Sequence, residues 1–235
     1  MAPGPAPGAV VLLSGGLDST TVLALAASAG RELHALSFRY GQRHEVELEH
    51  ARRQARRFGV RAHEVVDLAH VGTLVASATS LVRGSPLEVP KDGPGETIPS
   101  TYVPARNTLF LAYALAWAEA LGAAEIWLGV NALDYSGYPD CRPEFIAAFQ
   151  RLATLATRAG VEGRPIVLQT PLLELSKAQI VRAGQRLDVD YADTLSCYEP
   201  VVRGDFALAC GRCDSCRLRR LGFEQAGVPD PTRYV

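Results

Sequence analysis

A glycine pair that follows a short apolar run near the N-terminus places the strongest constraint on this chain. The run Val10–Leu13 consists of valines and leucines, which is typical of a buried strand. Gly15 and Gly16 come next, and because glycine has no Cβ they can take a positive φ in a tight turn. The acid and hydroxyl side chains of Asp18–Thr20 suit the start of a helix, where they can act as caps. The pattern therefore predicts a strand, a tight turn and a helix in immediate succession.

Such a turn is an anion site, because free backbone N–H groups and the positive end of a helix dipole both favour negative charge. The turn lacks the lysine of a Walker A loop and the three spaced glycines of the dinucleotide fingerprint. Ser14–Thr20 instead resembles the pyrophosphate loop of the ATP pyrophosphatases, which bind ATP and release AMP and pyrophosphate. We expect ATP to be held by this turn and its flanks, namely Leu12, Leu13, Ser14, Gly15, Gly16, Leu17, Asp18, Ser19, Thr20, Thr21 and Val22.

The composition limits the classes of partner. A chain of 235 residues with 48% hydrophobic content suits one domain with a small appendage. Its 24 Lys and Arg against 25 Asp and Glu give a net charge of -1, so no basic surface for nucleic acid is expected. No apolar stretch reaches the length of a membrane span, and residues 1–8 lack the pattern of a signal peptide. We expect a cytoplasmic protein that binds neither nucleic acid nor membrane, with residues 1–8 as a disordered lead.

Strand and helix patterns alternate along most of the chain. Strands are predicted at 10–13, 33–38, 61–67, 125–130 and 165–168, and helices at 17–27, 45–58, 108–121, 144–159 and 177–187. This order predicts a parallel sheet with helices on both faces, whose ligands lie beyond the carboxyl ends of the strands. Residues 79–104 contain five prolines and read as a long loop, for which a mobile lid is one hypothesis. We divide the chain into an α/β domain at 9–190 and a metal-binding segment at 191–235.

Four cysteines near the C-terminus have the spacing of metal ligands. Cys197, Cys210, Cys213 and Cys216 form the pattern C-x12-C-x2-C-x2-C, and the last three lie within one short stretch. In a reducing compartment such clusters hold metals rather than disulfides. Four thiolates make a closed structural zinc site, and an iron–sulfur cluster is the alternative. We favour zinc, because nothing else in the sequence indicates electron transfer.

Several motifs spread over the chain match one family. They are Ser14–Thr21, Tyr102–Asn107, Asn131–Phe145, Pro171-Leu172 with Lys177, Ser196–Tyr198 and Cys210–Cys216. Together they resemble the 7-cyano-7-deazaguanine synthase family of the queuosine pathway. The stretch between Cys197 and Cys210 is a few residues longer than the family pattern, although all four cysteines are present. The resemblance implies a Rossmann-like fold of the adenine nucleotide alpha hydrolase type with a small zinc-binding segment at the C-terminus.

The resemblance also implies the chemistry. The substrate would be 7-carboxy-7-deazaguanine, whose carboxylate is adenylated by ATP and then converted by ammonia to an amide. A second ATP would activate the amide oxygen, and loss of AMP would leave the nitrile. Magnesium, zinc and a homodimer are implied as well. The sequence leaves the source of ammonia open, although these 235 residues contain no glutaminase portion.

Three residues are candidates for catalysis. Asp18 can contact the ATP phosphates or hold Mg²⁺ through an oxygen, and a plain helix cap is the alternative. Lys177 can offset phosphate charge, and a solvated lysine at a helix end is the alternative. The planar fork of Arg106 matches the paired oxygens of a carboxylate or phosphate, and a structural arginine that ties loops together is the alternative.

The heterocycle needs a recognition site of its own. A deazaguanine presents a ring N–H beside an exocyclic amine, and one carboxylate can accept from both donors. Acids in the stretch after residue 130 are candidates for this contact, and tyrosines there can stack on the base. Ion pairing with Arg142 is the alternative for the acids, and helix capping is the alternative for Asn107. The candidate substrate residues are Asn107, Asp134, Tyr135, Tyr138, Asp140, Arg142 and Glu144.

Two other functions compete with nitrile synthesis. One is an amide-forming or tRNA-modifying ligase of the same ATP-pyrophosphatase group. The other is a binding module without enzymatic activity that has kept a nucleotide fold. The stretch 135–145 argues against the first, and the intact turn at 14–20 argues against the second.

Overall fold

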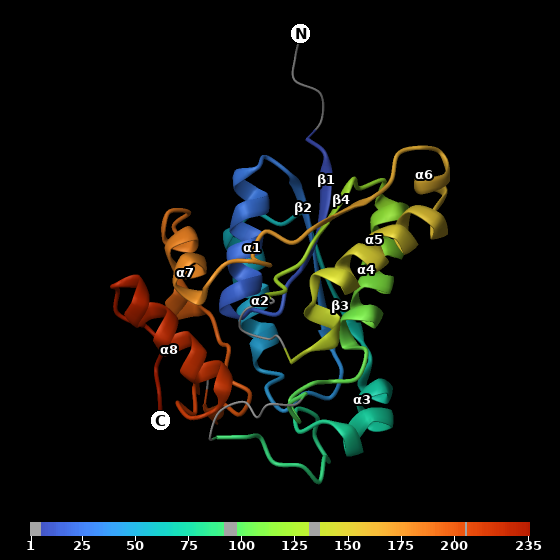
Figure 1. The fold of residues 1–235 in the computed structure, drawn as a ribbon. Helices are drawn as coiled ribbons and strands as arrows, with labels where there is room; N and C mark the ends of the chain where they lie inside the picture. The colour runs from blue at the N-terminus through green and yellow to red at the C-terminus, as the bar shows by residue number, and fades with distance from the viewer. Residues whose placement is uncertain (1–5, 92–97, 132–136, 205) are drawn as a thin grey trace.

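A computed structural model describes residues 6–91, 98–131, 137–204 and 206–235. Its centre is a parallel sheet of five strands in the order β3-β2-β1-β4-β5 (Figure 1). The strands are β1 (Gly8–Leu12), β2 (Glu32–Arg39), β3 (Ala62–Asp67), β4 (Glu125–Trp127) and β5 (Val167–Gln169). The order reverses at β1, where the chain leaves β3 and returns as β4 on the other side of β1. Ligands of open parallel sheets lie at such a switch point.

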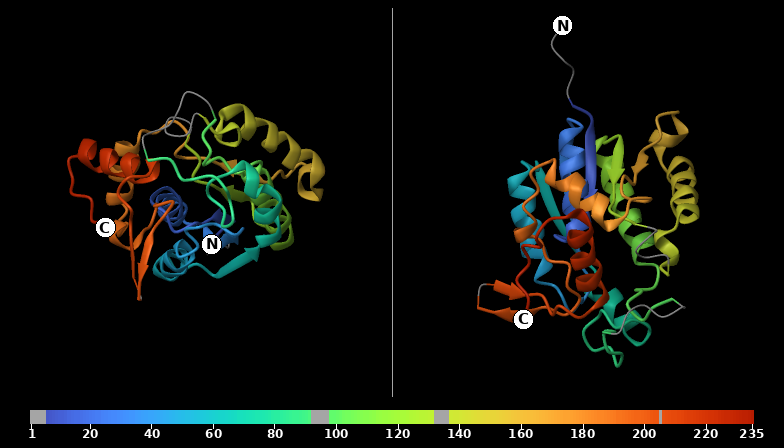
Figure 2. Two further views of the ribbon diagram at one scale, coloured as in Figure 1. Left: turned by 90° about the horizontal axis from the view of Figure 1, so that it is seen from below. Right: turned by 60° about the vertical axis from the view of Figure 1, so that its left-hand side comes forward.

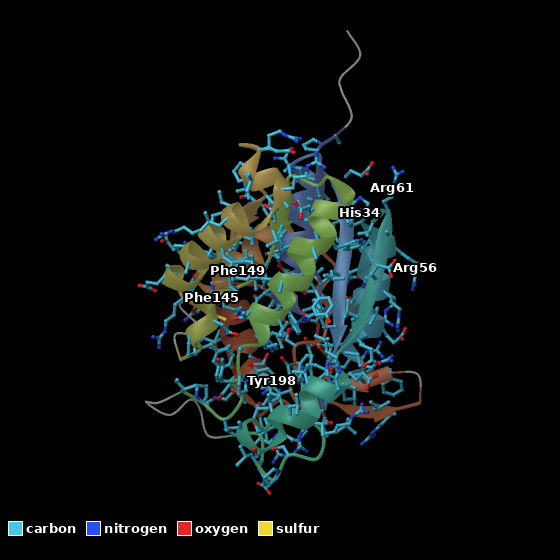
Figure 3. All side chains as sticks on the ribbon, turned by 90° about the vertical axis from the view of Figure 1, so that its right-hand side faces the viewer. His34, Arg56, Arg61, Phe145, Phe149 and Tyr198 are labelled. Atoms are coloured by element: carbon cyan, nitrogen blue, oxygen red, sulfur yellow. The ribbon has the colours of Figure 1, made fainter. Side chains whose placement is uncertain are left out.

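The helices form two layers, one on each face of the sheet (Figure 1). The helices α1 (Leu17–Ser28), α2 (Glu47–Arg57), α7 (Lys177–Gln185) and α8 (Asp214–Ala226) cover one face, and α4 (Arg106–Leu121) and α5 (Pro143–Ala156) cover the other. Two short helices, α3 (Ala69–Val75) and α6 (Arg158–Val161), and the 3-10 turns η1 (Ala76–Ala78), η2 (Pro139–Cys141) and η3 (Tyr191–Asp193) complete the domain. Phe145 and Phe149 lie on α5, and their rings are 6.2 Å apart (Figure 3).

The central strands are apolar on both faces because each face has its own core. In β1, Ala9 and Val11 contribute to the core beneath α1 and α7, and Val10 contributes to the core beneath α4 and α5. In β2, Leu33 contributes to the core beneath α1 and α7, and Leu36 contributes to the core beneath α4 and α5. Parallel strands covered on both faces therefore read as continuous apolar runs rather than alternating ones.

The sequence prediction of an α/β fold with a parallel sheet is confirmed. All five predicted strands and all five predicted helices are present, with shifted ends. The helix predicted at 144–159 was too long, because Thr157 has extended backbone and its side chain accepts from Gly160 N–H to start α6. The elements not predicted are α3, the 3-10 turns, the antiparallel pair β6 (Val201–Arg203) and β7 (Phe206–Leu208), and α8.

The C-terminal residues pack on the α/β domain. Phe223 of α8 belongs to the same core as Ile180 and Val181 of α7, while the β6–β7 hairpin projects beside the C-terminus (Figure 2). The division at residue 190 stays a prediction. No helix in the described ranges has both the length and the apolar character needed to cross a membrane.

The described part of the proline-rich segment is anchored to the domain. Leu81, Val82 and Val89 are buried in it. The Arg43 guanidinium donates to the carbonyl oxygens of Ser80, at 2.9 Å, and Leu87, at 3.3 Å. In this conformation residues 79–91 are packed on the domain, and the mobile lid stays a hypothesis.

A buried arginine joins α8 to the rest of the molecule. The Arg219 side chain is 3% exposed and pairs with Asp230 at 3.1 Å. It also donates to Thr194 Oγ1 and to the carbonyl oxygen of Tyr191, both at 2.8 Å.

We expect Arg219→Ala to lower the free energy of unfolding by about 3–5 kcal/mol, because it leaves the Asp230 carboxylate buried without its partner. Denaturant titration followed by circular dichroism measures this change. Arg217→Ala on the same helix is the matched control, because Arg217 is exposed. Equal effects of the two substitutions would contradict the assignment.

Candidate active site

The glycine turn lies between β1 and α1 and is packed backbone against backbone. Gly15 has a φ of +86°, and a Cβ added there would lie 2.4 Å from the Glu47 carbonyl oxygen and 2.5 Å from Ala51 N. The first turns of α2 therefore press directly on the turn. Only glycine satisfies both the positive φ and this close approach.

Hydrogen bonds fix the rest of the turn. Ser14 N–H donates to Ser19 Oγ at 3.1 Å, and Ser19 Oγ donates to the Gly16 carbonyl oxygen at 3.2 Å. From a distant part of the chain, Ser196 Oγ accepts from Leu17 N–H at 3.1 Å. Leu195 N–H donates to the Gly15 carbonyl oxygen at 3.0 Å. We call residues 195–198 the closing segment, because Leu195 and Ser196 hydrogen-bond to the backbone of the turn.

Asp18 does not cap α1. The N-cap is Gly16, which has no side-chain hydrogen bond to offer, and the Asp18 carboxylate instead pairs with Lys177. Lys177 Nζ lies 2.8 Å from Asp18 Oδ1 and 2.9 Å from Oδ2. The capping alternative for Asp18 and the solvated alternative for Lys177, which is 7% exposed, are therefore wrong. The pair places a cation and a carboxylate side by side at the N-terminus of α1.

A cavity opens beside the turn, at the carboxyl ends of β1, β2 and β4. Of the eleven residues predicted to hold ATP, seven line it: Leu12, Leu13, Ser14, Gly16, Leu17, Asp18 and Ser19. The other four do not line it. Gly15 faces α2 as described, Thr20 and Val22 are fully buried, and Thr21 Oγ1 is bonded to the Leu17 carbonyl oxygen and to Tyr191 OH.

Arg106 reaches the cavity from the start of α4. Ala105 before it has a φ of 53°, a left-handed conformation that non-glycine residues adopt at a cost of about 1 kcal/mol. The Arg106 guanidinium lies 5.8 Å from the centre of the Phe110 ring, and its Nη1 is 3.5 Å from Tyr40 OH. Among the described residues it has no carboxylate partner in an ion pair. It is therefore available for an anionic group in the cavity.

Asn107 and Asp140 bind each other. The Asp140 carboxylate accepts from Asn107 backbone N–H at 2.9 Å, and Asn107 Nδ2 donates to the Asp140 carbonyl oxygen at 2.9 Å. The capping alternative for Asn107 is thus wrong, because Asp140 supplies the cap of α4 and Asn107 lies inside the helix. Asn107 lines the cavity and Asp140 does not. Beside them, burial raises the pKa of the Cys141 thiol to about 12, as befits a packed side chain.

The other residues predicted to bind the substrate differ in whether they line the cavity. Tyr138 lines the cavity, and its hydroxyl forms a hydrogen bond of 2.6 Å with Thr101 Oγ1. Arg142 and Glu144 are exposed where α5 begins and do not line it. Asp134 and Tyr135 lie outside the described residues. Contact of any of these residues with a substrate stays a prediction.

The four cysteines converge on one point. Their Sγ atoms all lie within 4.8 Å of one another. Cys210 N–H donates to Cys197 Sγ at 3.1 Å, and Cys213 N–H donates to Cys210 Sγ at 3.4 Å, contacts that favour thiolates. Cys213 is the N-cap of α8, and Cys216 lies in its first turn. Bonds of about 2.3 Å from one tetrahedral ion place sulfurs about 3.8 Å apart, so this spacing fits a single metal ion.

The comparisons with known proteins give the family. Residues 8–227 match the family described as queuosine biosynthesis protein QueC. The chain belongs to this family. It is 59% identical over 227 residues to a 7-cyano-7-deazaguanine synthase of Saccharophagus degradans, covering 97% of both chains. It is 58% identical over 228 residues to that of Syntrophobacter fumaroxidans, covering 97% of this chain and 96% of the relative. The resemblance stated from the motifs is therefore confirmed.

A solved structure agrees on the fold. The chain superposes on NMN synthetase from Francisella tularensis with a TM-score of 0.50 and 19% sequence identity, covering 96% of this chain and 79% of that chain. At this identity the likeness concerns the fold alone. It supports the Rossmann-like architecture of the adenine nucleotide alpha hydrolase type.

Sequence reasoning missed several residues of the cavity. Tyr40 and His44 line it from the segment between β2 and α2, Glu47 lines it from the start of α2, and Ser196 and Tyr198 line it from the closing segment. Tyr198 lies in the lower half of the molecule in Figure 3. Burial raises the pKa of the Glu47 carboxyl to about 8. The signal for Tyr40, His44 and Glu47 was their placement directly after β2, since a carboxyl end of a parallel strand is where ligands lie. The signal for Ser196 and Tyr198 was the motif Ser196–Tyr198.

We expect Gly15→Ala to destabilise the protein by at least about 2 kcal/mol more than Gly30→Ala does, because a Cβ at residue 15 collides with the α2 backbone. Gly30 is a matched control, since its φ is +69° and a Cβ there meets nothing within 4 Å. Denaturant titration gives both values. ATP affinity, measured by calorimetry, should fall more than about tenfold only in Gly15→Ala. Equal affinities in the two variants would contradict a role of the turn in ATP binding.

Proposed function

We propose that this protein converts 7-carboxy-7-deazaguanine and ammonia to 7-cyano-7-deazaguanine, with two ATP molecules cleaved to AMP and pyrophosphate. The family match over residues 8–227 supports the reaction. The observation that carries it within the structure is the Asp18–Lys177 pair, because it puts a cation at the N-terminus of α1, next to the glycine turn predicted to bind phosphate. The enzyme is then a ligase that forms a carbon–nitrogen bond.

The chemistry explains why AMP must leave twice. A carboxylate is a poor electrophile because oxide is a poor leaving group. Transfer of AMP to that oxygen releases pyrophosphate, and ammonia then displaces AMP to give the amide. The amide oxygen attacks a second ATP at the α-phosphorus and releases a second pyrophosphate. Loss of AMP and of the remaining protons on nitrogen leaves the nitrile.

The side chains contribute positioning and charge stabilisation. The turn amides and Lys177 Nζ would bear the negative charge that develops on pyrophosphate. The Arg106 fork would hold the substrate carboxylate in line with the α-phosphorus. The Asp18 carboxylate would keep Lys177 in place and would hold Mg²⁺ through an oxygen, which neutralises phosphate charge.

We also propose zinc as the metal of the four cysteines. Four thiolates around one ion leave no open position, so its role would be structural. The partners are then ATP, ammonia and the carboxy-deazaguanine, and no nucleic acid is needed, in keeping with the net charge of -1. Five cysteines without a disulfide suit the cytoplasm. A homodimer is proposed on the family resemblance alone.

Incubation of the purified protein with ATP, ammonium and 7-carboxy-7-deazaguanine tests the reaction. We expect nitrile as the product and two AMP per nitrile, because each half-reaction consumes one ATP. Liquid chromatography with mass spectrometry measures both. Production of amide alone would support the amide-forming alternative, and formation of ADP instead of AMP would refute the proposal.

Metal analysis of the purified protein tests the cysteine site. We expect about one zinc ion per chain and negligible iron, because the sulfur spacing fits one ion. Removal by a chelator should lower the melting temperature, and added zinc should restore it, since metal binding supplies folding free energy. Stoichiometric iron with a visible absorption band would show that the iron–sulfur alternative is correct.

A further inference from the structure

Glu47 is an acid in the cavity that no lysine or arginine of the described chain neutralises, and burial lowers the pKa of the neighbouring His44 to about 4, so that this imidazole is neutral near pH 7. Asp18 and Glu47 are the carboxylates among the cavity-lining residues described. Asp18 is paired with Lys177, whereas Glu47 forms no ion pair with a lysine or arginine of the described part. Its side chain is only 12% exposed. An unpaired, largely buried carboxyl in a cavity is costly unless a ligand completes it.

The two carboxyl oxygens differ in their surroundings. Gln42 Nε2 lies 3.4 Å from Glu47 Oε1, and His44 Nε2 lies 3.5 Å from the same atom. Oε2 accepts no hydrogen bond from any residue that the structure describes. Gln42 is itself fixed, because its amide bonds to Tyr40 N–H at 2.8 Å and to the Phe38 carbonyl oxygen at 3.0 Å. The carboxyl is therefore held in place by one oxygen and presents the other for binding.

Flat aromatic walls surround this carboxyl. Tyr40, Phe110 and Tyr138 line the same cavity, and the ring of Phe38 stacks on that of Phe110 at 3.9 Å. Arg106 supplies the positive charge on this side of the cavity, too far from Glu47 for an ion pair but close enough to lower its pKa. The cavity thus joins an aromatic slot, an acceptor and a cation. A planar ring with N–H donors and an anionic substituent has the complementary features.

We infer that Glu47 is a specificity-determining residue that binds the ring N–H and the exocyclic amine of the deazaguanine. This inference rests on the proposed function. It assigns to α2 the contact that the sequence placed among the acids at 134–144. Asp140 is occupied as the cap of α4, and Glu144 is exposed away from the cavity.

The ionisation of Glu47 gives a signature. Burial raises the pKa of its carboxyl to about 8, against the smaller opposing effects of Arg106 and Gln42. Tyr40 and His44 are the other titratable groups that face it, and burial raises the pKa of Tyr40 to about 12. Binding two donors requires the ionised form, so below pH 8 the free protein must first lose a proton. Affinity for the carboxy-deazaguanine should therefore rise about tenfold from pH 6 to pH 7 and level off above pH 8.

The decisive experiment compares two ligands by calorimetry on the full, metal-loaded chain. They are 7-carboxy-7-deazaguanine and the analogue that lacks the exocyclic amine. The wild-type protein should prefer the first by at least about tenfold, because the analogue leaves a carboxylate oxygen without a donor. Glu47→Gln should bind the first ligand about 10- to 100-fold more weakly and lose the preference and the pH dependence. Its ATP affinity should change less than about threefold.

Two variants separate recognition from folding. Glu47→Asp keeps a carboxylate and should keep part of the preference even if stability falls. Glu45→Gln makes the same change two residues away, where Glu45 pairs with Arg39 at 2.7 Å and Arg83 at 2.9 Å, and should bind both ligands as the wild type does.

The measurements distinguish failure of the inference about Glu47 from failure of the proposed function. If the wild-type protein converts the carboxy-deazaguanine to nitrile but Glu47→Gln retains the preference, the inference is overturned and the proposed function stands. If Glu47→Gln weakens ATP binding as much as it weakens the deazaguanine, Glu47 acts through the glycine turn and the inference is again overturned. If the wild-type protein binds neither ligand and makes no nitrile, the proposed function fails and takes the inference with it.

Discussion

The close approach of backbone to backbone around the glycine turn is the constraint on which the site depends. Gly15 lies against the first turns of α2, and Gly129 after β4 would bring a Cβ within 3.2 Å of the backbone at Asp18 and Ser19. With side chains at these positions, α1 could not sit at the meeting point of β1, β2 and β4. The contact of Gly15 with the backbone of Glu47 also places Glu47 beside the cavity, which Arg106 lines from α4. The same packing thus sets the shape of the glycine turn, where we propose that ATP binds, and the position of Glu47, where we propose that the heterocycle binds.

The charges in the cavity follow from this packing. Asp18 and Lys177 neutralise each other's charge, which offsets part of the cost of burying the lysine. Glu47 and Arg106 remain apart, and each has a ligand position open to it. Asp18 and Lys177 form an ion pair at the N-terminus of α1, whereas Glu47 and Arg106 form none with each other. These two arrangements suit two kinds of ligand. The Asp18–Lys177 pair suits the flexible, highly charged triphosphate of ATP. Glu47 and Arg106 suit a rigid deazaguanine ring whose N–H donors and carboxylate lie apart.

Local patterns were enough to predict the sheet, its flanking helices and the glycine turn, because each depends on residues adjacent in sequence. The cysteine spacing was likewise sufficient to predict that the four cysteines converge. The start of α8 was missed because Cys213 and Cys216 were interpreted as loop ligands, although one caps the helix and the other lies in its first turn. Glu47 lies in a strongly charged helix whose sequence resembles a solvated face, and only tertiary packing buries it. The cap of α4 by Asp140 joins residues 33 positions apart, which no local pattern encodes.

The position of the cysteine cluster explains why a closed metal site belongs in this enzyme. Cys197 adjoins Ser196, whose hydroxyl accepts from Leu17 N–H at the first turn of α1. Cys216 adjoins Ser215, which also lines the cavity. A metal bound by these thiolates fixes both serines without touching a ligand. The hairpin between Cys197 and Cys210 could then vary in length, because the proposed ion and not the hairpin would hold the closing segment against the glycine turn. Such a metal would be structural in its coordination and would still determine how well the turn is closed.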